Sequence, residues 1–339
     1  MLALTLTLGL SACGVSPANN PPTEPPQTQP VETQPVETTP AEQSYYPVTI
    51  INYDYEGNEI ELTFEKAPEK VLCVYQGTIE TMIALGLEDH VVACCGLDNP
   101  VKSEWEAGLA KMNYNEEVFA PDKETVLMME PDLIFSWGSL FGEKKLGDVS
   151  EWIPNGTNTY ISTNTRRGGH PRTLENEYAD LINIGKIFNV EDKAQALVDE
   201  MKSEITSVLA QIEGQEPPRV SIIEFQGDDI SSYGATQLGG DMVTQLGAQL
   251  SDPEASSIGK EDLLGLDPDV IFVVYMARTE GVEEEMRAKV TEDPVFADLK
   301  AVQEDRVYTI MLGDMYASTV RSIDGIRTFA AGLYPELYQ

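Results

Sequence analysis

The stretch ETVLMMEPDLIFSWG, residues 124–138, recurs in altered form as EDLLGLDPDVIFVVY at residues 261–275. Aligned without gaps, the two copies share Glu, Leu, Pro, Asp, Ile and Phe at matching positions. In each copy the proline ends a helix, and the apolar residues after it begin a central strand. The same helix-to-strand join therefore occurs twice, which indicates two lobes built alike.

Strands and helices alternate around the first copy. Residues 47–66 alternate apolar and polar positions on both sides of a turn at 56–58, which is typical of a β-hairpin. Short apolar runs then predict buried strands, and helical spacing predicts the segments between them: strands at 70–75, 90–96 and 132–137, helices at 78–87 and before Pro131. This alternation predicts a parallel sheet with helices on both faces.

The second half repeats the pattern after two consecutive helices, predicted at 173–188 and 191–212. The helix at 191–212 would span on the order of 30 Å, enough to bridge two lobes. The remaining predicted elements are strands at 219–225 and 306–311, a helix at 241–249 and a closing helix at 317–337. The fold class is therefore α/β, with two lobes around mainly parallel sheets.

Composition narrows the range of partners. The chain has 339 residues and a formal charge of −35, a field that repels nucleic acid and anionic lipid. After the start, no apolar window is long enough for a transmembrane helix. Cys73, Cys94 and Cys95 lie in apolar runs, where cysteine behaves as a small buried hydrophobe, so no disulfide framework is predicted.

The N-terminus resembles a lipoprotein leader. MLALTLTLGLSAC is a short apolar run whose last four residues, followed by Gly14, resemble the bacterial lipobox, although no Lys or Arg precedes Lys66. Cys13 would then carry lipid and anchor the protein outside the bacterial cell membrane. Residues 14–43 are rich in proline and predict an extended tether. The expected domains are 1–13, 14–43, a lobe at 44–188, a connecting helix at 189–214 and a lobe at 215–339.

Motifs for catalysis are not recognisable in the sequence: no GxSxG, Walker A loop, HExxH or GxGxxG follows a strand. We therefore expect no enzyme, no catalytic residue, no resident metal and no cofactor. The residues that point to function lie in loops after strand ends, where α/β sheets bind ligands. The candidates combine aromatic and basic side chains: Tyr75, Gln76, Trp137, Phe141, Arg166, Arg167, Phe225, Tyr233, Met276, Arg278, Tyr316 and Arg321. Such a set suits a bulky, flat or polydentate anionic ligand held in a cleft.

From Pro47 onward the chain resembles the lipid-anchored bacterial substrate-binding proteins of ABC transporters for siderophores, haem and cobalamin. The resemblance is carried by the hairpin, by KAPEKVLCVYQGTIETMIALGLEDHVVACCG (66–96), by both helix-to-strand joins and by DPVFADLKAVQEDRVYTI (293–310). It implies two Rossmann-like lobes joined by one long helix, here 191–212, with the ligand between them. That rigid connector implies only a small hinge movement.

The resemblance also implies partners. The family presents one glutamate per lobe to the membrane permease, which points to Glu143 and Glu261. The expected partners are therefore a metal chelate, an ABC permease with its ATPase subunits, and the membrane through the lipid anchor, with no nucleic acid and a monomeric protein. For the ligand, a ferric siderophore ranks first, a corrinoid such as cobalamin second and haem third. A lipid-anchored enzyme and an acidic adhesin are the rival classes.

Overall fold

The computed structural model describes residues 44–142, 145–227 and 229–338, and all structural statements below concern these residues. Ser44–Gln339 form one compact unit. It opens with the predicted hairpin of β1 (Val48–Tyr53) and β2 (Glu59–Phe64), paired antiparallel. The buried Asn52 side chain donates to Ile161 O (3.0 Å) and accepts from Ile161 N (2.8 Å), as a neighbouring strand would. These two hydrogen bonds fix the hairpin against the first sheet.

The first lobe is a parallel sheet of five strands in the order β5-β4-β3-β6-β7. Its central strand is fully buried, as expected for a parallel strand covered on both faces. The strands are β3 (Val71–Val74), β4 (Val91–Cys95), β5 (Tyr114–Asn115), β6 (Leu133–Ser136) and β7 (Asn158–Ile161). The helices are α1 (Gln76–Ala84), α2 (Glu106–Leu109), α3 (Lys123–Met129) and α4 (Val149–Trp152).

The second lobe is a mixed sheet in the order β11-β9-β8-β12-β13, with β10 also paired to β8. Its strands are β8 (Arg219–Gln226), β9 (Asp229–Ser232), β10 (Gln249–Leu250), β11 (Ser257–Ile258), β12 (Val270–Tyr275) and β13 (Val307–Met311). Its helices are α7 (Leu238–Gln245), α8 (Lys260–Leu266), α9 (Val282–Thr291), α10 (Lys300–Gln303), α11 (Leu312–Met315) and α12 (Ser322–Leu333). The short strands β9 and β11 run antiparallel to their neighbours and lack the apolar alternation that would have predicted them.

The two copies of the repeated stretch form α3–β6 and α8–β12, as predicted. Each helix ends on an acidic residue with left-handed backbone, Glu130 (φ 47°) or Asp267 (φ 42°), directly before the proline. The aspartate after the proline accepts hydrogen bonds from the start of the adjacent strand: Asp132 from Glu69 N (2.7 Å) and Lys70 N (2.9 Å), Asp269 from Arg219 N (2.7 Å). The shared aspartate therefore aligns neighbouring strands in both lobes.

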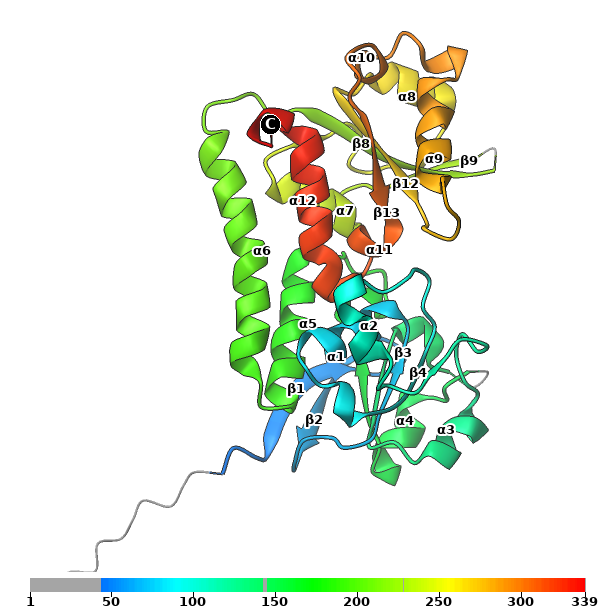
Figure 1. Cartoon of the computed structure of the whole chain (residues 1–339), viewed down its shortest axis with the longest axis vertical. Helices are drawn as coiled ribbons and strands as arrows, with labels where there is room; N and C mark the ends of the chain where they lie inside the picture. The colour runs from blue at the N-terminus through cyan, green and yellow to red at the C-terminus, as the bar shows by residue number, and fades with distance from the viewer. Residues whose placement is uncertain (1–43, 143–144, 228, 339) are drawn as a thin grey trace, which may run out of the picture. The chain divides into compact units, whose positions relative to one another are not determined.

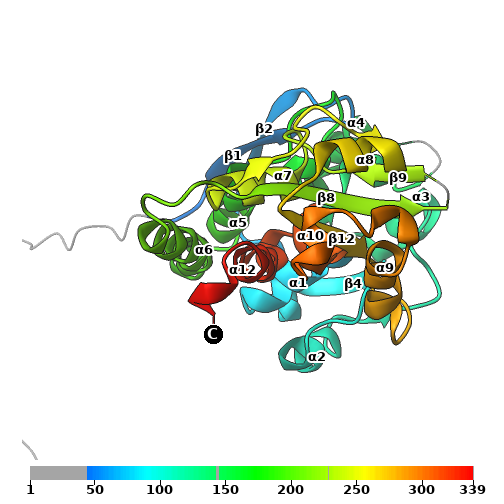
Figure 2. The ribbon, with the colours of Figure 1, turned by 90° about the horizontal axis from the view of Figure 1, so that it is seen from above.

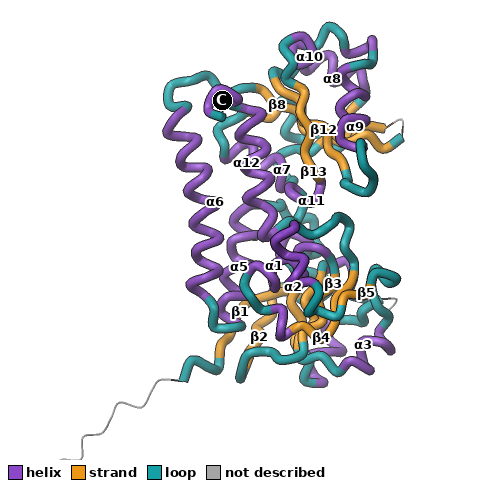
Figure 3. Tube along the Cα trace, in the orientation of Figure 1, coloured by secondary structure: helices purple, strands orange, loops and turns teal. Residues whose placement is uncertain are grey.

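One long helix, α6 (Glu191–Gln211), connects the lobes as predicted, and α5 (Leu174–Ile187) precedes it. They lie side by side, and α12 packs along α6 in both views (Figures 1 and 2). Ile184, Ile187 and Ala194, near their junction, belong to the core of the first lobe, while Val198 and Ile205 farther along α6 join the core of the second. The α5–α6 pair therefore shares apolar contacts with both lobes. Figure 3 shows the trace of α6 running from the level of the first lobe to that of the second.

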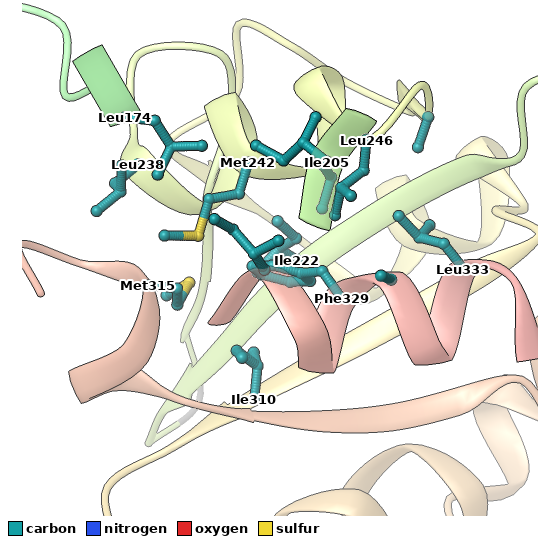
Figure 4. Packing of buried hydrophobic residues seen from close by; sticks show 14 of the residues in the cluster. Leu174, Ile205, Ile222, Leu238, Met242, Leu246, Ile310, Met315, Phe329 and Leu333 are labelled. Atoms are coloured by element: carbon teal, nitrogen blue, oxygen red, sulfur yellow. The ribbon is translucent and has the colours of Figure 1, made fainter. Parts of the chain in front are cut away.

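Helix α12 contributes large apolar side chains to the core of the second lobe. Phe329 and Leu333 of α12 pack with Ile222 of β8, Met242 of α7 and Ile205 of α6 (Figure 4). The predicted closing helix at 317–337 is shorter at both ends, since α12 spans Ser322–Leu333. It starts late because Thr319 has a left-handed backbone (φ 46°), which interrupts helical geometry after α11. No helix in the described part of the chain is long and apolar enough to cross a membrane.

Candidate functional site

A narrow pocket lies between the two lobes. It forms where the carboxyl ends of β3 and β6 in the first lobe meet those of β12 and β13 in the second, the position at which α/β sheets bind ligands. The residues that line it are Tyr75, Gln76, Gly77, Glu80, Asp98, Asn99, Trp137, Met276, Leu312, Gly313, Tyr316, Ala317 and Ser318.

Aromatic rings form one wall of the pocket. The ring centroid of Trp137 lies 3.7 Å from that of Tyr75 and 5.8 Å from that of Tyr316, so the three rings form a continuous surface. Phe119 packs edge-on against Tyr75 (5.8 Å), and Tyr233 edge-on against Tyr316 (6.5 Å). Such rings take large apolar or π-faced ligand area out of water at low conformational cost.

Tyr75 has an unusual backbone. Its φ of 90° and ψ of 153° lie in a region that is essentially reserved for glycine. The conformation is held from both sides, because Tyr75 N donates to Cys95 O (2.9 Å) and Tyr75 O accepts from Ile79 N (3.3 Å). The Tyr75 hydroxyl donates to Asp98. Burial and this carboxylate raise the pKa of Tyr75 well above its usual value, so the hydroxyl stays protonated.

Because of this strain, we predict that glycine at position 75 gives a more stable protein than alanine, the reverse of the usual order within a strand. Tyr75→Gly should be more stable than Tyr75→Ala by about 1 kcal/mol or more, because only alanine retains the strained backbone. Urea unfolding of both variants measures the difference. The matched control is Glu61 in the middle of β2, where alanine should be the more stable of the same two replacements. Equal stability of the two variants at position 75 would argue that Tyr75 is not strained.

A buried ion pair across the lobes forms the floor of the pocket. The Arg321 guanidinium donates to Glu80 through Nε (2.6 Å) and Nη2 (2.7 Å), and both side chains are almost fully buried. Gln76 links this pair to the pocket, because Gln76 Nε2 donates to Glu80 (2.7 Å) and Gln76 Oε1 accepts from Asp98 N (3.0 Å). The floor is therefore a satisfied polar network that orients Gln76 beneath the aromatic wall.

Further contacts join the lobes at the rim of the pocket. Asn99 Oδ1 accepts a hydrogen bond from Ala277 N (3.0 Å), and Arg321 Nη2 donates to Pro100 O (2.8 Å). Arg278 lies 4.0 Å from Asp98, although its side chain is 63% exposed. These contacts hold the two lobes together on one side of the pocket.

Two buried carboxyls lie on α5 behind the pocket. Glu177 accepts a hydrogen bond from Thr319 N of the other lobe. Asp180 accepts from Tyr160 Oη (2.8 Å) and from Thr163 N (2.8 Å). Burial, together with the Glu177 carboxylate, raises the pKa of Asp180 to about 7 despite these hydrogen bonds. Asp180 therefore takes up a proton on folding at mildly acidic pH.

The raised pKa of Asp180 predicts a pH-dependent stability. In the unfolded chain this carboxyl titrates near 3.8, and in the folded protein near 7. Its contribution is therefore complete below pH 3.8 and is lost as the pH rises to about 7, by roughly 4 kcal/mol. Chemical unfolding from pH 4 to 8 should show a shallower decline for Asp180→Asn than for the unmodified chain. The exposed Asp199→Asn should keep the original slope; a steep slope in both variants would contradict the assignment.

The structure brings part of the predicted site together. Tyr75, Gln76, Trp137, Met276 and Tyr316 line the pocket. Tyr233 lies behind Tyr316, and Arg278 lies at the rim. Arg321 is in the floor, but its guanidinium is occupied by Glu80 and does not line the pocket.

Four other predicted residues lie elsewhere. Phe141 is buried in the core of the first lobe, and Phe225 packs beside a core cluster of the second. Arg166 lies over the ring of Tyr53 (5.0 Å) and Arg167 over that of Tyr55 (4.0 Å), both on the hairpin side. Neither arginine lines the pocket: Arg166 also donates to Thr163 O (2.8 Å), and Arg167 lies 3.9 Å from Glu56 of the hairpin turn.

Sequence reasoning missed Arg172, Asn99, Asp98 and Glu80. The Arg172 guanidinium lies 3.8 Å from the centroid of the Tyr316 ring, and its Nη1 is buried without a hydrogen-bond partner. The sequence feature that could have pointed to Arg172 is its position at the end of the loop that contains Arg166 and Arg167. For Glu80, the signal was an acid within an apolar helical run, since a buried carboxylate needs a partner.

The predicted anchor and docking residues lie apart from this pocket. Cys13 and Glu143 are outside the described residues. Glu261 is exposed in the first turn of α8, and within the described ranges it forms no ion pair. Among the residues that the structure describes, no group of three or more His, Cys, Asp or Glu side chains could hold a metal ion.

Comparisons with known proteins agree on the family. A family model described as periplasmic binding protein matches residues 71–311. An uncharacterized ABC transporter substrate-binding lipoprotein of Bacillus subtilis is 25% identical over 302 residues, covering 87% of this chain and 88% of its own length.

Two solved structures extend the comparison. A periplasmic binding protein from Veillonella parvula is 32% identical with a TM-score of 0.81, covering 86% of this chain and 93% of that one. An ABC-type Fe³⁺-hydroxamate transport protein from Saccharomonospora viridis, 21% identical, shows the same fold with a TM-score of 0.66 and covers 85% and 99% of the two chains. The chain therefore belongs to the periplasmic binding protein family.

Proposed function

We propose that the protein captures a metal chelate, a ferric siderophore in the first instance, between its two lobes and delivers it to the permease of an ABC importer. The observation that carries this proposal is the aromatic pocket between the lobes, with Tyr75, Trp137 and Tyr316 in one wall. A binding role is supported by relatives named as substrate-binding proteins, including one named as a lipoprotein. A corrinoid is the alternative ligand, because its large apolar face suits the same wall.

The test is a titration of the purified chain with ferric siderophores, cobalamin and haem, followed by tryptophan fluorescence. Trp137 lies in the pocket wall, so binding should quench its emission, and Trp137→Phe should abolish most of the signal change. At least one chelate should bind below about 10 μM, roughly 7 kcal/mol of affinity. If no chelate reaches that affinity, the transport function is wrong.

The arginines of the 162–172 loop provide a control. Because Arg166 and Arg167 are held by the hairpin tyrosines, the double replacement Arg166→Ala with Arg167→Ala should change chelate affinity by less than about twofold. A large loss would show that these side chains leave the hairpin and reach the ligand.

The proposal extends to the permease and the membrane. We propose that Glu143 and Glu261 meet basic residues of the permease, one from each lobe, and steer docking by charge. Lipid on Cys13 and a tether at 14–43 would place the lobes at 44–188 and 215–339, with their connector at 189–214, outside the cell membrane. Glu143→Ala with Glu261→Ala should abolish uptake but leave ligand affinity unchanged; altered affinity would count against docking. Replacing the exposed Glu213 and Glu216 instead should leave uptake intact.

A further inference from the structure

The lining of the pocket contains no positive charge within the described residues. Its thirteen residues include no Lys, Arg or His, and its ionised groups are the carboxylates of Glu80 and Asp98. Glu80 is neutralised by Arg321 in the floor. Asp98 accepts a hydrogen bond from the Tyr75 hydroxyl, and its nearest cation among the described residues is the mostly exposed Arg278, 4.0 Å away.

Charges around the pocket also leave no positive surplus. Lys102 forms an ion pair with Asp324. Asp314 lies 3.7 Å from Arg321, whose guanidinium is already paired with Glu80. Burial raises the pKa of Asp314 to about 7, so this carboxyl is partly neutral near physiological pH. The local charges therefore cancel or remain slightly negative.

Besides Arg278 at the rim, Arg172 is a second cation beside the pocket in the described part of the chain. It lies against the face of Tyr316, outside the lining, and one of its nitrogens is buried without a partner. On the same side, Tyr233 donates to Glu224 (2.6 Å), which places a carboxylate near Arg172. Arg172 can therefore meet a single acceptor group of a ligand, but it cannot neutralise several negative charges.

A multiply anionic ligand would enter this pocket at a large electrostatic disadvantage. Ions removed from water need compensating charges, and the pocket supplies none in its lining. The formal charge of −35 adds a repulsive field on approach. A chelate without net charge avoids both effects and still gains from the aromatic wall.

We propose that the pocket selects metal chelates with a net charge near zero and discriminates against multiply anionic ones; this inference rests on the proposed chelate-binding function. Three hydroxamates, each singly negative, cancel the charge of a ferric ion. Three catecholates, each doubly negative, leave a strongly anionic complex. Ferric trihydroxamates and corrinoids therefore share the required chemistry, and ferric tris-catecholates lack it.

The experiment compares one ferric trihydroxamate, one ferric tris-catecholate and cobalamin on the full chain, by fluorescence titration at low and high NaCl. The trihydroxamate should bind at least about 100-fold more tightly than the tris-catecholate at low salt. Its affinity should hardly change with salt, whereas that of the catecholate should rise as salt screens the repulsion. Tight binding of cobalamin alone would support the charge selection and move the function to the corrinoid alternative.

Two matched variants test whether the carboxylate of Asp98 causes the preference for uncharged chelates. Asp98→Asn removes the lumenal carboxylate and should reduce the preference for the trihydroxamate several-fold. Glu213→Gln removes an equal charge from the exposed end of the connector and should leave the preference unchanged. Equal or tighter binding of the tris-catecholate by the unmodified chain overturns this inference and leaves the proposed function standing. Binding of no chelate overturns both.

Discussion

Arg321→Met should lower the free energy of unfolding by about 3–5 kcal/mol, because it leaves the Glu80 carboxylate buried without its partner. Glu80 is 0% exposed and Arg321 is 5% exposed, so neither charge is rescued by water. The loss also removes the hydrogen bond from Arg321 to Pro100 O, which joins the two lobes. Urea unfolding at neutral pH measures this difference.

Two further variants separate the ion pair from other effects of the replacement. Adding Glu80→Gln to Arg321→Met should recover at least about half of the loss, since the unpaired charge is then gone. Arg327→Met breaks contacts to Glu200 and Glu204 at the surface, where the Arg327 side chain is 47% exposed, and should cost within about 1 kcal/mol. A loss of that small size for Arg321→Met would show that the pair contributes little to folding.

Trp137→Ala should weaken chelate binding at least about 30-fold, close to 2 kcal/mol, because it removes the middle ring of the aromatic wall. Trp137 contacts the rings of both Tyr75 and Tyr316, so its loss also removes the contact that joins the two lobes in this wall. Since the tryptophan in the pocket wall is then lost as a probe, isothermal titration calorimetry is the measurement.

The control for this prediction is Phe225→Ala. Phe225 was an equal candidate in the sequence, but it packs beside a core cluster of the second lobe and does not line the pocket. Its replacement should change affinity by less than about threefold while lowering stability. Similar losses of affinity for both variants would place the ligand elsewhere.

Local patterns predicted the scaffold because they depend on neighbours in sequence. Helical and strand periodicity, and the proline after each helix of the repeated stretch, predicted α3–β6 and α8–β12 before any contact was known. The rule that ligands meet strand ends also placed Tyr75, Trp137 and Tyr316 in the pocket. The elements that escaped, such as β9 and β11, are short strands without apolar alternation.

The arginines show where local patterns fail. Arg166, Arg167 and Arg321 carry the right chemistry for an anionic ligand and stand in suitable loops. Their long side chains are engaged by Tyr53, Tyr55 and Glu80, which are distant in sequence. Arg172, which the sequence did not distinguish, instead lies against the pocket wall.

The sequence by itself determined the two α/β lobes, the doubled helix-to-strand join and the strand ends at which a ligand would lie, because backbone propensity and apolar periodicity are local properties. Only the tertiary structure decided the charge of the pocket. That charge depends on which carboxylate each arginine meets, and Glu80 and Arg321 come from different lobes. The pairing of charges across the lobes thus turns a prediction of an anionic ligand into the proposal of a neutral one.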